Sequence, residues 1–301
     1  MKQTLSNGTS VRLPIVMTGT STITASIYDS FGAKTLPTLS AEAFNGHSEL
    51  RLDKILSTLL YDGAERGSGV LVRYQAHNIK AVINGTTYHF KRYLQHRGII
   101  LSDMSSFVKY PGYELTIPFD YKIRDVECKL KGQYLFNDQD VEYFNDSTGV
   151  FSIEIADGAN GPLSIVMGEE SETRDIIART VPEHPFYLRW LNKYGGWDYF
   201  MFACRQKLTT TLTENEYYQP YEEDGMRSYR KEGKEVVEVS SGQVDKSILD
   251  ALTYMPLSPD IRLYKKDTHE WVPIQIENGD TELFSDQPTG ELVFSFLTKK
   301  F

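Results

Sequence analysis

Residues 185–202 are the most informative segment of the chain, and they read Pro185-Phe-Tyr-Leu-Arg-Trp-Leu-Asn-Lys-Tyr-Gly-Gly-Trp-Asp-Tyr-Phe-Met-Phe202. Two aromatic runs flank the five residues Asn192–Gly196, which include a Gly-Gly pair, and this arrangement is typical of a β-hairpin. Successive side chains of a strand point to opposite faces, and here both faces of both runs are largely apolar. We therefore predict a hairpin that must be covered on both sides, either by its own domain or by a neighbouring subunit.

Three uses of this hairpin fit the sequence. It can be the core hairpin of a β-sandwich, an interface between subunits, or an aromatic platform on which a sugar stacks. In the third case the stacking rings would be those of Trp190, Trp197, Tyr194 or Tyr199. The candidate interface or core residues are Tyr187, Trp190, Tyr194, Gly195, Gly196, Trp197, Tyr199 and Phe202.

Strand signals also dominate the rest of the chain. The clearest is at residues 80–91, where Asn84-Gly85 separates two strand-like runs and favours the type I′ turn of a hairpin. Only Ser247–Leu252, ahead of Pro256, indicates a helix, while residues 50–60 can be read as a strand followed by a short helix and stay ambiguous. The other expected strands are residues 23–28, 70–74, 126–130, 151–155, 163–167, 235–239, 260–264, 271–276 and 291–297.

The chain has 301 residues, which is more than one hydrophobic core usually holds. We predict a mainly β fold with two or three β-sandwich or barrel-like domains and few short helices. Turn-forming residues accumulate around Tyr110-Pro-Gly-Tyr113, so we expect an N-terminal β domain at 1–115, a middle β segment at 116–180 and a C-terminal β domain at 181–301. The last of these contains a polar, acidic segment at 214–233 that is expected to form a long exposed arm or loop.

The amino-acid composition indicates which classes of partner the chain is expected to bind. The 19 Tyr and 15 Phe suit sheets and the centres of protein interfaces. The net charge of −9 repels nucleic acid and anionic membranes, so no direct nucleic-acid recognition and no membrane contact are expected. The N-terminal residues lack the apolar core of a signal peptide, and no stretch approaches the roughly eighteen apolar residues of a membrane span. We therefore expect a cytosol-like compartment.

Motifs that carry chemistry are missing from the sequence. Cys128 and Cys204 have no metal-binding spacing and are expected to be buried free thiols, and the six His residues never fall in HExxH spacing. Neither a GxSxG elbow nor a phosphate-binding glycine loop occurs, so we expect no catalytic residues, no metal and no cofactor. Asp138–Asp146 spaces oxygen donors as a calcium loop does but lacks the Gly and Glu of an EF-hand, and a solvated loop is the alternative. The pair Asp138 and Glu142 could in principle serve a glycosidase.

The Tyr187–Phe202 segment, with its Trp-Leu-Asn and Gly-Gly pattern, resembles a segment of virion proteins from tailed bacteriophages and prophages of gut bacteria. The likeness covers roughly residues 185–301, because the order of the later segments is similar too: Ser240-Ser241, a short helix at Ile248–Leu252, a strand at Ile261–Tyr264, Trp271-Val-Pro-Ile274 and a terminal Phe-rich strand.

The resemblance implies a structural subunit of a tail, baseplate or neck (connector) ring. Such subunits use β domains that repeat around a symmetric tube and contact both like copies and other virion proteins. They carry no catalytic residues, so none are transferred to this chain. The expectation is thus a non-enzymatic, ring-forming homo-oligomer that is made in the host bacterial cytoplasm and located in the virion. A carbohydrate-binding module is the alternative, and a polysaccharide or cell-wall hydrolase is the third interpretation.

Overall fold

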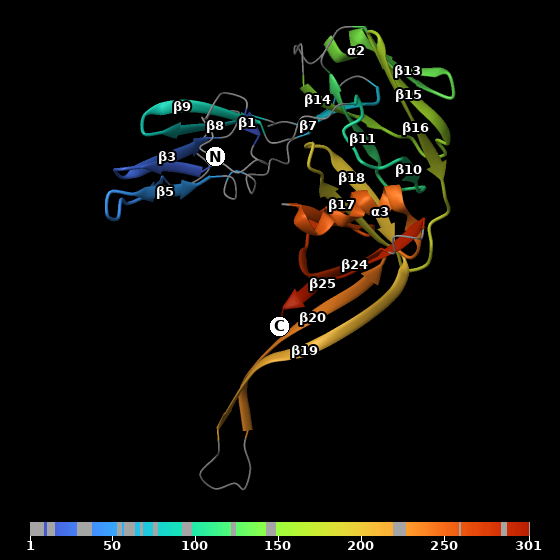
Figure 1. The fold of residues 1–301 in the computed structure, drawn as a ribbon. Coiled ribbons are helices and arrows are strands. Elements are labelled where there is room, and N and C mark those ends of the chain that lie inside the picture. The colour runs from blue at the N-terminus through green and yellow to red at the C-terminus, as the bar shows by residue number, and fades with distance from the viewer. Residues whose placement is uncertain are drawn as a thin grey trace. The chain divides into compact units, whose positions relative to one another are not determined.

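The structure is a computed structural model, and it describes residues 9–10, 16–28, 38–52, 56, 64–66, 69–74, 78–91, 98–121, 125–142, 149–218, 227–258, 260–283 and 288–300 (Figure 1). Over these residues the fold is mainly β with several sheets, as the sequence predicts. Two compact units are distinguished by their internal contacts. Unit 1 comprises residues 1–180, 191–198 and 258–260, and unit 2 comprises residues 181–190, 199–257 and 261–301.

The first sheet of unit 1 follows the order β1 (Thr9–Ser10), β9 (Thr86–Lys91), β8 (Asn78–Ile83), β3 (Ile23–Tyr28) and β4 (Leu39–Ala41). A separate two-stranded sheet pairs β2 (Val16–Gly19) with β5 (Ser48–Arg51). The core of this region is formed by alternate residues of the strands together with two leucines: Ile23, Ala25, Ile27, Leu52, Leu56, Ala81, Ile83 and Phe90. Alternation of period two in the sequence therefore corresponds to burial on one face.

The predicted hairpin at residues 80–91 is confirmed by the pairing of β8 with β9. Ile83 lies opposite Thr86, which leaves Asn84 and Gly85 as the two turn residues. Their φ angles are 47° and 81°, the two positive values that a type I′ turn requires. Of the ambiguous segment, residues 50 and 51 end β5, whereas residues 53–55 and 57–60 lie outside the described residues.

Two further sheets of unit 1 form a β-sandwich. One has the order β10 (Ser106–Lys109), β16 (Glu170–Ala178), β15 (Gly161–Met167), β12 (Val126–Leu130) and β13 (Gln133–Asn137), and the other β11 (Thr116–Tyr121), β14 (Gly149–Glu154), β7 (Leu71–Tyr74) and β6 (Ala64–Arg66). The buried rings of Phe119 on β11 and Phe136 on β13 stack across the two sheets with centroids 5.4 Å apart. A short helix, α2 (Asp138–Glu142), follows β13.

Strands from both sides of residue 115 build this sandwich. β7 pairs with β14, and β10 pairs with β16, so each sheet joins strands that lie far apart in the sequence. The sandwich therefore draws on the predicted N-terminal and middle segments together. The division of the chain into three domains stays a prediction.

Unit 2 contains most of a four-stranded sheet with the order β18 (Trp197–Phe202), β17 (Phe186–Leu191), β22 (Ile261–Lys265) and β23 (Glu270–Pro273). A five-stranded sheet has the order β19 (Cys204–Tyr218), β20 (Arg227–Ser240), β25 (Thr289–Lys300) and β21 (Val244–Asp245), and β24 (Gln275–Leu283) pairs with β25. Phe202 on β18 contacts Phe294 on β25 at a centroid distance of 4.8 Å, so these two sheets pack on each other.

The predicted helix at 247–252 is confirmed as part of α3 (Lys246–Thr253), which lies against β25 and buries Leu249 and Leu252. A 3₁₀ turn, Met255–Leu257, follows it. The predicted strand at 271–276 is in fact two strands, because the chain leaves β22 at Pro273 and joins β25 at Gln275. Among the described residues no helix combines the length and the apolar character that spanning a membrane requires.

Candidate functional site

The candidate residues of the sequence lie on the β17–β18 hairpin and its turn. Tyr187, Trp190 and Phe202 are at most 1% exposed, and Tyr194, Trp197 and Tyr199 are between 6% and 9% exposed. The chain itself thus covers both faces of this hairpin, as it would for a core hairpin. A contact between the hairpin and a neighbouring subunit stays a prediction, and it would have to use β18, which is an edge strand of this sheet among the described residues.

An open stacking surface for a sugar is not formed by these rings. Stacking requires an accessible ring face, whereas Tyr187 packs against Tyr199 with centroids 5.9 Å apart. Trp271 of β23 lies 5.7 Å from Tyr187, and the guanidinium of Arg189 sits 4.4 Å from the centroid of Trp271. Tyr199 is therefore covered by other aromatic side chains, and the remaining candidate rings of Trp190, Trp197 and Tyr194 are at most 9% exposed.

The turn of the hairpin explains the Asn and Gly-Gly positions of the motif. The side-chain oxygen of Asn192 accepts hydrogen bonds from the backbone N–H groups of Tyr194 and Gly196, at 2.9 and 3.1 Å. Gly195 has a φ of 92°, which an L side chain rarely adopts. A Cβ on Gly196 would lie 2.2 Å from the Cβ of Pro118, so the backbone approaches β11 too closely for any side chain. The Asn192 and Gly195 positions are thus required by the turn itself, and Gly196 by its close approach to β11.

Polar bonds fix this turn to residues 101–103 of the same unit. The amide nitrogen of Asn192 donates to the carbonyl oxygen of Leu101 at 2.7 Å, and the Tyr194 hydroxyl donates to Asp103 at 2.7 Å. Lys193 forms an ion pair with Asp103 at 2.6 Å. Each bond joins residues about ninety positions apart, so the turn is held by long-range contacts as well as by its own geometry.

Asp198 is the most perturbed titratable group of this region. Its carboxylate is 2% exposed and accepts a 2.6 Å hydrogen bond from the Ser102 hydroxyl. Burial raises the pKa of the Asp198 carboxyl to about 7, against the opposing effect of hydrogen bonds from Ser102 and Asn192. Ser102 is itself 1% exposed and also accepts the N–H of Met104, so its hydroxyl is closed to a substrate. The arrangement positions a loop and does not resemble a nucleophile with its base.

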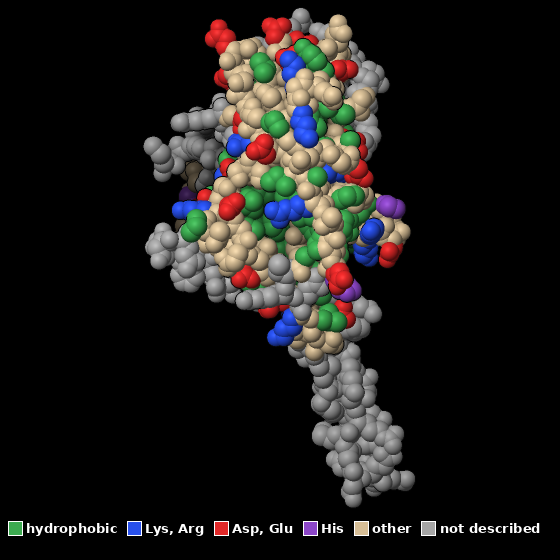
Figure 2. All heavy atoms as spheres, turned by 90° about the vertical axis from the view of Figure 1, so that its right-hand side faces the viewer, with side chains coloured by type: hydrophobic (Ala, Val, Ile, Leu, Met, Phe, Trp, Pro, Cys, Tyr) green, Lys and Arg blue, Asp and Glu red, His purple; other side chains and the backbone are tan. Residues whose placement is uncertain are grey.

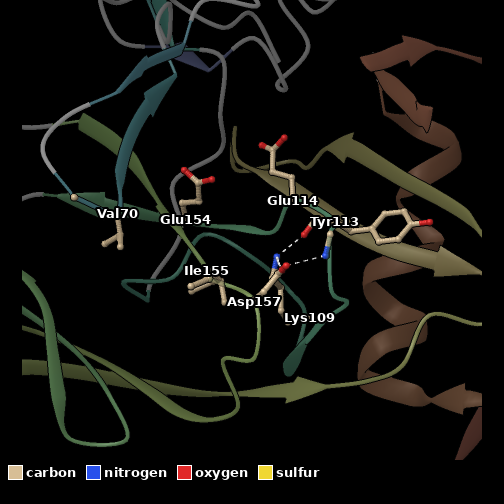
Figure 3. A pocket seen from close by; sticks show the side chains of 10 residues that line it. Val70, Lys109, Tyr113, Glu114, Glu154, Ile155 and Asp157 are labelled. Atoms are coloured by element: carbon tan, nitrogen blue, oxygen red, sulfur yellow. Dashed lines mark hydrogen bonds and ion pairs between the residues drawn. The ribbon is translucent and has the colours of Figure 1, made fainter. Parts of the chain in front are cut away.

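A second polar site is a cavity of about 470 Å³ in unit 1, beside Lys109 (Figure 3). Lys109 is 5% exposed, donates to the carbonyl oxygen of Tyr113 and pairs with Asp157 at 2.9 Å. Asp157 also accepts the N–H of Gly112 at 2.9 Å, and the hydrogen bond from Lys109 lowers the pKa of its carboxyl. These bonds hold the predicted turn at residues 110–113. Glu114 and Glu154 line the same cavity.

Asp138, the first residue of the acidic segment at 138–146, has a structural role. The Asp138 carboxylate accepts the backbone N–H groups of Asp125 and Val126, the latter at 2.8 Å, and the hydroxyl of Tyr121 at 3.3 Å. It therefore ties α2 to the start of β12. Residues 143–146 lie outside the described residues, and in the part of the chain that is described no group of three or more His, Cys, Asp or Glu is placed to hold a metal ion.

Cys128 is buried and free, and burial raises the pKa of its thiol to about 12. The sulfur is therefore protonated at neutral pH and is a poor nucleophile and metal ligand. This confirms the expected buried free thiol for Cys128, while the side chain of Cys204 lies outside the described residues.

The β19–β20 ribbon is the feature of unit 2 that differs most from the hairpin (Figure 1). β20 pairs with β25 from Lys234 to Ser240, whereas its pairing with β19 continues to Tyr218 and Arg227. Residues 212–218 and 227–233 therefore form a two-stranded ribbon without a third strand among the described residues, and we call it the β-arm. It contains most of the predicted arm at 214–233, of which residues 219–226 lie outside the described residues.

β19 is an edge strand, because within the described residues it pairs with β20 and no other strand. The four consecutive residues Lys207–Thr210 are all exposed, and Leu208 is 61% exposed. Since consecutive side chains point to opposite faces, neither face of this part of β19 is covered. β24 is the edge on the opposite side of β25.

In comparisons with known proteins, no family model matches the chain, and no curated protein matches its sequence. The resemblance of residues 185–301 to phage virion proteins therefore stays a prediction from the sequence.

Some residues of the site could not be found from the sequence. An acidic residue inside an aromatic strand, such as Asp198 beside Trp197, is a signal for a buried carboxyl with a partner. The partner, Ser102, is 96 positions away and has no sequence signal. The exposed edge at Lys207–Thr210 had a weak signal, since a Thr-rich run without aromatic residues suits a strand that packs against little.

Proposed function

We propose that this chain is a non-enzymatic structural subunit of a tailed bacteriophage virion, in the tail, the baseplate or the neck (connector) ring. It assembles with further copies of itself and with other virion proteins. In this role the β domains supply interfaces, and the buried polar groups at Asp198 and Lys109 keep loops in place.

The β-arm is the observation that carries the proposal. A two-stranded hairpin alone is at best marginally stable in water, because too little apolar surface is buried to offset the ordering of the chain. Within the described part of the chain no third strand pairs with its outer edges, and unpaired N–H and C=O groups at a sheet edge pair readily with another chain. A protein that presents such a ribbon therefore gains stability from a neighbour, which is the situation of a subunit in an assembly.

The charge distribution supports proteins as the partners. The net charge is −9, and on the face drawn in Figure 2 Lys and Arg side chains lie among acidic and apolar ones. They form no continuous basic stripe over the described residues of that face, as a nucleic-acid track would. The resemblance of residues 185–301 to virion proteins supports a phage particle as the assembly to which the chain belongs.

The experiment is to locate the chain in particles of the phage that encodes it. Antibodies raised against the recombinant protein are used for immunogold electron microscopy, and purified particles are analysed by quantitative mass spectrometry, with pre-immune serum as the control. The expected result is label at one position of the tail, baseplate or neck and a fixed copy number that matches a ring. A chain that is absent from particles and monomeric at every concentration would contradict the proposal.

A further inference from the structure

We propose that β19 of one copy pairs with β24 of a second copy, so that the five-stranded sheet of unit 2 continues from subunit to subunit. The inference rests on the proposed function and names the surface through which the copies meet. The partner is a second copy of this chain, and the contact is heterologous, meaning that two different edges meet.

The topology of the sheet makes this pairing geometrically direct. Neighbouring strands in the series β19, β20, β25 and β24 are all antiparallel, so β19 and β24 run in opposite directions at the two edges. A second copy placed edge to edge in the same orientation brings its β24 beside β19 as an antiparallel strand. Repetition of this step closes a ring when the rotation between copies is a fraction of a full turn, and otherwise gives a filament.

The edge of β19 has a regular stretch that suits strand addition. Register shifts occur between Cys204 and Lys207 and between Leu212 and Glu214, whereas the pairing from Lys207 to Leu212 is regular. Natural proteins protect edge strands with bulges, prolines and short lengths. This stretch contains neither Pro nor Gly, has three consecutive threonines of high β-propensity, and exposes Lys207–Thr210 on both faces.

Charge complementarity selects β24 as the partner strand. The sequence of β24 contains Glu277, Asp280 and Glu282 and no basic residue, whereas residues 204–212 of β19 contain Arg205 and Lys207 and no acidic residue. Opposite charges across an interface favour encounter and register, and like charges oppose the wrong pairing. Two β19 edges would place basic residues together, and two β24 edges would place acidic residues together. Glu277 pairs with Lys234 of its own copy, and Asp280 and Glu282 are the further acidic residues in the sequence of β24.

The first test maps the contact in the full-length protein. A photo-reactive benzoylphenylalanine replaces Thr209, and unlabelled and ¹⁵N-labelled chains are mixed before irradiation. The expected products are cross-linked peptides of mixed isotope composition that join residue 209 to a peptide containing β24. The same probe at Tyr134, which is 65% exposed in unit 1, is the control and should give no link to β24. Inter-copy links from residue 209 to any other segment would overturn the proposed pairing.

The second test reverses one charge. Lys207→Glu is expected to weaken self-association about tenfold in sedimentation velocity, because it places an acidic residue against an acidic strand. Lys246→Glu makes the same charge change at an exposed position outside both edges and should leave association unchanged. Addition of Glu282→Lys to Lys207→Glu should restore it. If the Lys207→Glu protein associates as well as the wild-type protein does, this pairing is overturned while the proposed function stays intact. If the wild-type chain is monomeric and absent from particles, both proposals are overturned.

Discussion

Two hairpins follow each other in this chain, and they are covered in opposite ways. In β17–β18 every side chain is buried or half-buried, aromatic rings occupy both faces, and hydrogen bonds join the turn to Leu101–Asp103. In β19–β20 the residues Lys207–Thr210 are exposed on both faces. The pairing of β19 with β20 also continues beyond Lys234, where the pairing of β20 with β25 ends. The difference teaches that large aromatic side chains let a chain cover its own strands, whereas the Thr-rich stretch of β19 is left exposed on both faces.

The largest expected effect is on the free energy of unfolding, and it differs between the two hairpins. Trp190→Ala removes a fully buried ring and should lower the free energy of unfolding by about 3–5 kcal/mol. Leu208→Ala in β19 truncates an exposed side chain and should change it by less than about 0.5 kcal/mol. Urea denaturation of monomeric protein measures both. Similar losses for the two variants would show that the hairpins are covered equally.

Next in size is the close approach at the β17–β18 turn. Gly196→Ala places a Cβ against Pro118 and should cost about 1–3 kcal/mol of unfolding free energy through overpacking. Gly132→Ala in the turn between β12 and β13 has open space but a φ of 79°, and is expected to cost about 1 kcal/mol from backbone strain. Thermal denaturation compares the two variants. A Gly196→Ala protein as stable as the wild type would mean that the turn does not approach β11 this closely.

The buried carboxyl predicts a pH dependence. Because the folded pKa of Asp198 is raised to about 7 from its usual value, the folded state holds this proton more tightly than the unfolded state does. The resulting stabilisation is fully present below pH ~4 and is lost as the pH rises through about 7. Asp198→Asn, which keeps the neutral shape, should remove a decline on the order of 1–3 kcal/mol between these pH values. Denaturation curves at several pH values test this, and an identical decline in both proteins would refute it.

The smallest expected effect concerns one hydrogen bond of the turn. Tyr194→Phe removes the donor to Asp103 and should cost about 1 kcal/mol, because the carboxylate loses a partner in a half-buried place. Tyr264→Phe removes an exposed bond to His269 and serves as the matched control, with a loss below about 0.5 kcal/mol. Equal losses would indicate that the turn is not held from Leu101–Asp103.

Local chemistry made much of the fold predictable. The Asn84-Gly85 turn, the strands at 23–28, 126–130 and 163–167, and the helix at 247–252 depend on residues close in sequence, and each lies where it was expected. The break at Ile274 was missed although Pro273, within the run from Trp271 to Ile276, is a signal against one continuous strand. Its cause is the change of partner from β22 to β25, which depends on distant strands.

Contacts between residues far apart in the sequence could not be predicted, and several of them build the candidate site. The burial of the β17–β18 residues follows from their apolar character on both faces, but the pairing of Asp198 with Ser102 joins segments 96 residues apart. The exposed arm was expected from the polarity of residues 214–233. Its extension as a ribbon from β19 and β20 was not, because the polar sequence at 214–233 lacks the alternation of apolar and polar residues by which half-buried strands are identified.

The central claim, that the chain covers its aromatic hairpin and leaves the edge of β19 to another copy, is tested most directly by hydrogen–deuterium exchange at a series of protein concentrations. The account predicts that backbone amides at 207–212 become slower to exchange as concentration rises, while those of Trp197–Phe202 stay equally protected throughout. Concentration-dependent protection of Trp197–Phe202, with no change at 207–212, would contradict it.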